Sequence, residues 1–201
     1  MKVLVVVTHP RQDSLTGSVT KQLIEGLTEA GHEYEIADLY AEGFDPLLHP
    51  ADEPDWDNPN KIYSEEVMRE MKRVRNNDAI LFVFPLWWFG VPAMLKGYID
   101  RVWNNGFAYG QDSVTGERYR LPVEKIGWVS LVGGTQPHFE KHGHDVAINR
   151  ELTYLVDYVG VKEAAVHYLY ETIEKFPDDS EKEKRHYDAI LNEAYRIGQQ
   201  F

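Results

Sequence analysis

KVLVVV, at residues 2–7, places five aliphatic residues in a row after Lys2. A short apolar run of this kind is typical of a parallel strand that is buried on both faces. The polar segment THPRQDSLTG follows it. Residues 18–30 then space their apolar side chains as a helix does, and Gly31 ends the pattern. The order of strand, polar loop and helix is the repeating unit of an α/β fold.

The same alternation continues along the whole chain. Further strands are predicted near residues 35–37 and at 79–84, 126–132 and 164–170, and further helices from Pro92, over 144–159 and over 180–197. Five strands alternating with helices predict a doubly wound parallel sheet, flavodoxin-like by strand count, in one domain over residues 1–201. Ligands of such sheets bind at the carboxyl ends of the strands. The loops after Val7, Phe84 and Val132 are therefore the place to look for a site.

Composition excludes several classes of function. The 201 residues carry a formal net charge of −12, which disfavours binding to nucleic acid or to anionic membranes, since both select a basic face. The chain has no cysteine, hence no disulfide, thiolate metal site or thiol nucleophile, which fits a cytoplasmic protein. Residues 79–95 are uncharged, but they fall short of the roughly 20 residues of a spanning helix and contain two prolines. No integral membrane segment is expected.

The loop after the first strand, His9 to Thr16, precedes a helix whose first amides and positive dipole end could hold a phosphate. Ser14, Thr16 and His9 add donors, although the loop could equally be a polar connection with a helix cap. It has neither the glycine pattern of a dinucleotide-binding turn nor a P-loop.

The loops after the third and fourth strands suit a flat ring. Pro85-Leu86-Trp87-Trp88-Phe89-Gly90 offers aromatic faces and backbone amides to a flavin, with core packing or a dimer interface as the alternative. Val132-Gly133-Gly134-Thr135 would let a ring approach the backbone closely, or it is a plain turn. The three loops lie on one edge of the predicted sheet, and together they favour a flavin site.

At this point the sequence resembles a known family, the NAD(P)H:quinone oxidoreductases of the flavodoxin-like, modulator of drug activity type. The segments that carry the resemblance are HPRQDSLT at 9–16, ADLYAEGFDP at 37–46, FPLWWFGVPAMLKGYIDRVW at 84–103, GFAYG at 106–110 and the glycine pair at 133–134. They span nearly the whole chain in the family's order, and the block at 84–103 is the most specific of them.

The resemblance implies a role for each matching residue. The flavin's phosphate side would be held by His9, Ser14, Leu15 and Thr16, its ring by Pro85, Leu86, Trp87, Trp88 and Phe89, and its pyrimidine edge by Leu131, Val132, Gly133 and Gly134. Tyr109 would reach into the partner subunit's site of a homodimer.

Two positions depart from the family. Phe139 stands where a tyrosine is often found, so the reduced flavin's charge would fall to His144 or His142, and Gln111 stands where animal relatives have a second tyrosine.

The resemblance also implies the reaction. NADPH or NADH would pass a hydride to the flavin, and a quinone or similar small acceptor would then take two electrons in the same slot, without a metal. The long loop at 46–62, with Trp56, Asn58 and Asn60, favours FAD over FMN, because FAD-binding relatives have a similar insertion near the adenine. Alternatives are a flavodoxin-type electron carrier, a regulatory ancillary subunit of a potassium-efflux system and a protein without flavin.

Overall fold

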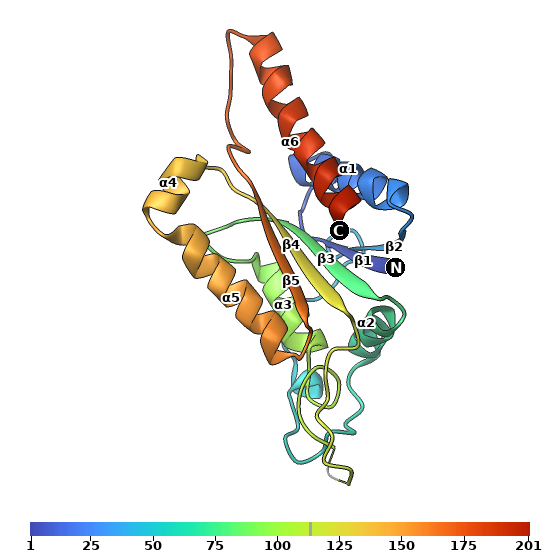
Figure 1. Ribbon diagram of the computed structural model, residues 1–201. Coiled ribbons are helices and arrows are strands. Elements are labelled where there is room, and N and C mark those ends of the chain that lie inside the picture. Colours follow the sequence, from blue (N-terminus) through green and yellow to red (C-terminus); the bar gives the residue numbers. More distant parts are fainter. Residues whose placement is uncertain (113) are drawn as a thin grey trace.

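A computed structural model describes residues 1–112 and 114–201, and its centre is a five-stranded parallel sheet (Figure 1). The strands lie in the order β2–β1–β3–β4–β5, which confirms the flavodoxin-like, doubly wound class. All four pairings are parallel. The bounds are β1 Lys2–Val7, β2 Glu33–Asp38, β3 Ala79–Pro85, β4 Lys125–Leu131 and β5 Glu163–Leu169.

Helices cover both faces of the sheet (Figure 1). Their bounds are α1 Leu15–Glu29, α2 Glu65–Arg75, α3 Ala93–Val102, α4 Gln136–Lys141, α5 His144–Tyr158 and α6 Ser180–Gln200, with a short 3-10 helix, η1, at Pro50–Asp52. Two of these helices, α2 and α4, were not predicted. The signal for α2 was present, since Ser64 caps it and Val67, Met71 and Val74 share its buried face.

Two hydrophobic cores sit on either side of the sheet because side chains alternate along each strand. In β1, Leu4 and Val6 pack with α2, α3 and α5. Val3 and Val5 face the other way, toward α1 and α6. Both sets are fully buried, which explains the unbroken apolar run in the sequence.

Two predicted helix starts move in the structure. Helix α1 begins at Leu15 with Ser14 as its cap, so it starts before the predicted Ser18 and its amino terminus belongs to the loop after β1. Pro92 is not the first residue of α3 but its cap, because its ψ of 150° is extended. No helix within residues 1–112 and 114–201 is both long enough and apolar enough to cross a membrane.

Candidate functional site

The loop after β1 ends in a capped helix. The buried Ser14 side chain accepts a hydrogen bond from the Gly17 amide at 3.2 Å, which satisfies one of the amides at the start of α1. The amides of Leu15 and Thr16 have no partner within residues 1–112 and 114–201. Two open amides and a helix dipole give this loop the chemistry of an anion site.

His9 joins the first loop to the loop after β3. Nδ1 of His9 lies 3.1 Å from the Arg11 amide and 3.1 Å from the Arg11 carbonyl oxygen, so the backbone of Arg11 fixes the orientation of the ring. The His9 ring lies 6.3 Å, centroid to centroid, from the Trp87 ring. The sequence-predicted loops after β1 and β3 therefore meet at the point where strand order reverses between β1 and β3.

Residues 87–90 form a tight turn with an unusual backbone. Trp87 and Gly90 exchange two backbone hydrogen bonds, at 3.2 and 3.1 Å. Trp88 and Phe89 between them have φ values of 52° and 59°, the geometry of a type I′ turn that Asn-Gly normally occupies. Left-handed backbone at bulky residues costs on the order of 1–3 kcal/mol each. The turn nevertheless leaves the Trp88 side chain 96% exposed.

Phe89 connects this turn to the start of α5. Its ring stacks on His144 with centroids 4.3 Å apart and planes 29° apart. Phe139 lies on the other side, 5.4 Å from the His144 ring. His142 points elsewhere, because its ring lies 4.4 Å from His138 and its Nδ1 bonds to the His138 carbonyl. The structure thus brings His144, and not His142, to the aromatic turn.

The loop after β4 lies beside the same turn. The Leu86 amide donates to the Leu131 carbonyl at 2.8 Å, which ties the end of β3 to the end of β4. A Cβ on Gly134 would meet nothing within 4 Å, whereas one on Gly133 would come 3.0 Å from Ile173. Of the glycine pair, Gly134 is the one that faces open space. Pro85 and Val132 lie at the ends of the two strands and are largely buried.

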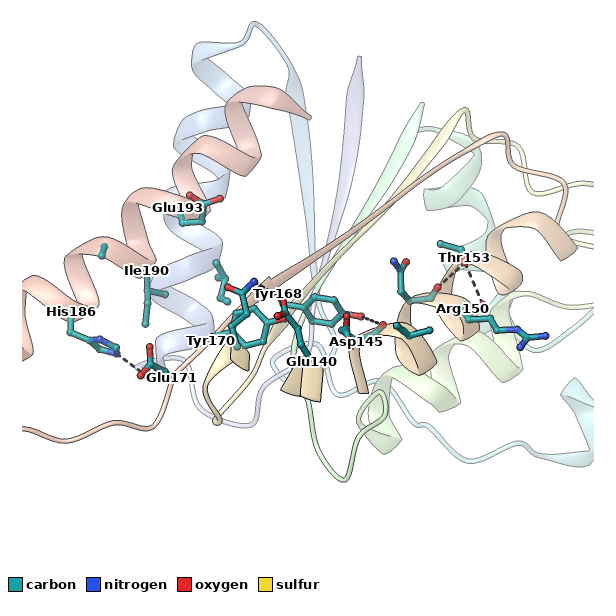
Figure 2. Close-up of a pocket in the computed structure, with 15 residues that line it drawn as sticks. Glu140, Asp145, Arg150, Thr153, Tyr168, Tyr170, Glu171, His186, Ile190 and Glu193 are labelled. Carbon is teal, nitrogen blue, oxygen red and sulfur yellow. Dashed lines mark hydrogen bonds between the residues drawn. The ribbon is translucent and has the colours of Figure 1, made fainter. Parts of the chain in front are cut away.

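Sequence reasoning missed two tyrosines at this site. The rings of Tyr168 and Tyr170 in and after β5 lie 5.6 and 5.7 Å from Phe139. The Tyr168 hydroxyl donates to the Asp145 carbonyl at 3.3 Å, in the first turn of α5 (Figure 2). Burial, with the Tyr170 and Asp145 side chains nearby, raises the pKa of Tyr168 to about 12, so its hydroxyl keeps its proton. No periodic pattern in the sequence indicates these two tyrosines. They reach the site because β5 pairs with β4 in the folded sheet.

A cavity of about 1030 Å³ is lined by residues of β5, α5 and α6. Figure 2 draws the residues that line it. Its lining carries Glu140, Asp145, Glu171 and Glu193 against the basic residues Arg150 and His186. The His186 ring bonds to the Glu171 carbonyl at 2.9 Å. An excess of carboxylates makes this cavity unsuited to a phosphate, and it contains none of the residues of the three loops.

The turn at 87–90 precedes the amino end of α3, whereas Tyr109 and the long loop at 46–62 lie near the carboxyl end of that helix. The loop leaves β2 and passes along α3, where Gly97 leaves no room for a Cβ beside Pro46. It ends near Tyr109, whose ring lies 5.7 Å from Trp56. A ten-residue helix is about 15 Å long. Within one chain, therefore, Tyr109 and Trp56 lie away from the turn at 87–90.

That long loop is held by a buried ion pair. Arg101 and Asp52 have side chains 3% and 0% exposed and lie 2.7 Å apart. Asp52 also accepts from the Ser64 amide at 2.8 Å, and Arg101 reaches Glu66 at 2.5 Å. Burial acts to raise the pKa of Asp52, but the bonds from Ser64 and Arg101 outweigh it and hold that pKa below its usual value.

No group of three or more histidine, aspartate or glutamate side chains within residues 1–112 and 114–201 is arranged to hold a metal ion. His142 and His144 stack with centroids 5.8 Å apart.

Comparison with known proteins agrees with the fold and the loops. The family profile described as a flavodoxin-like fold matches residues 1–191. An uncharacterised NAD(P)H oxidoreductase of Escherichia coli, YcaK, is 38% identical over 193 residues, which cover 96% of this chain and 94% of that protein. The chain belongs to the NAD(P)H:quinone oxidoreductase family.

Other members are more distant. The ribosyldihydronicotinamide dehydrogenase [quinone] of Mus musculus is 34% identical over 158 residues, covering 71% of this chain and 68% of that one. Among solved structures, the NAD(P)H:quinone oxidoreductase from Methanothermobacter marburgensis superposes with a TM-score of 0.84 at 31% identity, covering 99% of this chain and 94% of that one. This chain is therefore an oxidoreductase of that family.

Proposed function

We propose that this oxidoreductase binds a flavin at the carboxyl edge of its sheet and reduces quinones by two electrons at the expense of NADPH or NADH. The single observation that carries the proposal is the turn at 87–90. Two bulky aromatics held in left-handed backbone, with Phe89 stacked on His144, form a costly arrangement. Strain of this kind persists where function requires it.

The residues present fit a flavin. The open amides of Leu15 and Thr16 and the nearby imidazole of His9 suit its phosphate. The open space at Gly134 would admit the edge of a flat ring. A bound flavin supplies the redox chemistry, since it takes a hydride from a nicotinamide and returns two electrons to an acceptor.

The protein's own side chains would orient the flavin and balance the charge of its reduced state. Trp87 and Phe89 would provide faces for stacking, and the strained turn fixes where those faces point. His144 is the first residue of α5, so the helix dipole favours negative charge beside it. Its ring nitrogens have no partner within the described residues, and we assign to His144 the proton that balances the charge of the reduced state.

We further propose FAD rather than FMN, and a homodimer. Trp56 is 71% exposed and contacts the Tyr109 ring, so the two would enter a partner's site together. There Trp56 offers a stacking face for an adenine, while Tyr109 would close the slot in which nicotinamide and quinone alternate. One shared slot requires ping-pong kinetics.

The test is the visible spectrum of the purified protein. We expect a flavin band that NADPH or NADH bleaches without oxygen and that menadione restores, with parallel lines in double-reciprocal plots. Cofactor released by heat is then run against FAD and FMN standards. A protein that stays colourless after incubation with both flavins would refute the proposal. An FMN peak would overturn only the choice of FAD, and intersecting lines only the shared slot.

A further inference from the structure

A second cavity, of about 520 Å³, lies at the carboxyl end of α5. It shares no lining residue with the acidic cavity along the preceding turns of that helix. The hairpin segment at 118–120, the last turns of α5 and the start of the link to β5 line it. Its volume is within the range of small-molecule sites, about 300–1,000 Å³.

The lining of this cavity is basic, although the protein as a whole is acidic. Arg118, Arg120 and Lys162 contribute three cations, and Asp157 is the only carboxylate that lines it. None of the three cations forms an ion pair within residues 1–112 and 114–201. In a chain of net charge −12, three unpaired cations around one hollow create a local positive potential.

Aromatic rings form the rest of the wall. Tyr154 and Tyr158, one turn apart on α5, are 65% and 51% exposed, and Tyr119 lines the same cavity. The hydroxyl of Tyr119 donates to Asp112 at 3.2 Å, which fixes its position. Exposed tyrosines beside cations combine a stacking surface with charge.

A glycine after the carboxyl end of α5 leaves room for the side chain of one of the arginines. Gly160 ends α5 with a φ of 75°, and a Cβ there would come 2.9 Å from Cγ of Arg120. The Arg120 side chain therefore lies across the glycine. The Leu121 amide, next in sequence, donates to the Val159 carbonyl at 3.0 Å, so the segment that carries the arginines is tied to the end of the helix.

Neutralising the helix dipole does not account for this arrangement. The carboxyl end of a helix is equivalent to about half a negative charge, and its effect falls off within the last turn. A single cation would more than neutralise half a negative charge, whereas three cations line this cavity. Two of the cations also come from the separate segment at 118–120 rather than from the helix.

We infer that this cavity binds an aromatic ring that carries a phosphate, the adenosine-phosphate half of a nucleotide. The arginines and Lys162 would hold the phosphate, and the tyrosines would stack on the base. The ligand is either a free nucleotide or the distal half of the nicotinamide cosubstrate. The second source would rest on the homodimer proposed above, because Tyr158 lies 6.0 Å from Tyr109.

The experiment is titration calorimetry of the flavin-loaded protein with adenosine 5′-monophosphate, adenosine and inorganic phosphate. We expect the monophosphate to bind more tightly than either fragment and to weaken as salt is added. The double variant Arg118→Gln/Arg120→Gln should lose at least about tenfold in affinity, the loss expected for charge-assisted hydrogen bonds. The control Lys184→Gln/Arg185→Gln removes the same charge from the exposed face of α6 and should bind as the parent does.

Steady-state kinetics then separate the two sources. If the cavity serves the cosubstrate, the double variant raises KM for NADPH or NADH while KM for the quinone stays the same, and the monophosphate competes with the cosubstrate. If it serves a free nucleotide, binding falls with no change in either KM. The inference is overturned if the monophosphate does not bind the parent protein, or if the double variant and the control bind it equally. A flavin-loaded protein that does not reduce quinones would refute the proposed function and leave the calorimetric result standing.

Discussion

The turn at 87–90 and the loop at 46–62 both carry exposed tryptophans, but they are held in opposite ways. The turn is closed by two backbone hydrogen bonds and has strained φ angles, and Trp88 is almost fully exposed to solvent. The loop is anchored by a fully buried ion pair between Asp52 and Arg101 and by the Asn104 amide, which donates to the Asp52 carbonyl at 2.7 Å.

The difference shows which of the two regions is fully supported by contacts within a single chain. The turn is strained and leaves Trp88 exposed, and the proposed flavin and second subunit would supply further contacts there. A loop with its own buried network needs nothing further to keep its shape, so it can act as a fixed platform. Breaking each kind of support should therefore have a different consequence.

The largest effect is expected from Arg101→Met. It leaves Asp52 buried without its counter-charge, and such losses cost about 3–5 kcal/mol. Urea unfolding at pH 7 measures the change. The control is Lys96→Met, which breaks the exposed Lys96–Asp100 pair on the same helix and should cost less than about 1 kcal/mol.

The pH dependence sharpens this prediction. The depressed pKa of Asp52 contributes stability that is present above its unfolded value near 4 and is lost as pH falls through the lower folded pKa. Without Arg101 the buried carboxyl protonates more readily. The gap in unfolding free energy between the two proteins should therefore narrow from pH 7 to pH 3. A constant gap would mean that Arg101 acts through packing alone.

The second prediction concerns the uncovered turn. Trp88→Glu places a charge on the surface that we expect a second copy to bury, and tryptophans at such positions are worth about 2 kcal/mol or more. Sedimentation at micromolar concentration should show a dimer for the parent and a shift toward monomer for the variant. Val146→Glu, at another exposed apolar residue, should remain dimeric. A parent that sediments as an active monomer contradicts the homodimer.

The sequence predicted the two regions unequally well, for a physical reason. Runs such as 2–7 and 79–84 must be strands because burial on both faces leaves no polar position, and their carboxyl ends fix the site's edge. The path of the loop at 46–62 depends on the pairing of Asp52 with Arg101, 49 residues away. Such a long-range bond has no local pattern. The stacking of Phe89 on His144 also needed the fold, because it joins loops of two different strands.

The third prediction separates His144 from its neighbour. If His144 balances charge at the site, His144→Ala should slow hydride transfer by about tenfold or more, since each tenfold is ~1.4 kcal/mol. His142→Ala should have a smaller effect, because His142 lies against His138 and not against Phe89. Stopped-flow bleaching with NADPH gives both rates. Equal rates in parent and both variants would remove the histidines from the mechanism.

The fourth prediction uses the strain directly. Phe89→Gly relieves a left-handed backbone, so the flavin-free protein should gain about 1 kcal/mol in unfolding free energy. The same change removes the ring that stacks on His144, and the affinity for flavin should fall. Trp87→Gly is the matched control, since Trp87 has no positive φ and glycine there should not stabilise. A Phe89→Gly protein that is both less stable and equally avid for flavin would show that the turn stores no functional strain.

The smallest effect is expected from Tyr168→Phe, which tests how His144 is positioned. The hydroxyl of Tyr168 donates to the Asp145 carbonyl over a long 3.3 Å, and such a bond contributes about 0.5–1.5 kcal/mol. Its loss should loosen the first turn of α5 and slow hydride transfer a few-fold. Because the tyrosine stays neutral up to its raised pKa of about 12, the pH profile of the rate should not change.

Tyr170→Phe is the control for that change, because the Tyr170 ring also contacts Phe139 but its hydroxyl has no hydrogen bond within residues 1–112 and 114–201. It should retain the parent rate. If both variants lose the same amount, the aromatic surroundings of Phe139 position His144, and the bond to Asp145 does not. If Tyr168→Phe alone is slow and also shifts the pH profile, Tyr168 itself exchanges a proton at the site. A slow Tyr168→Phe with an unshifted profile, beside an unaffected Tyr170→Phe, assigns the effect to the placement of α5.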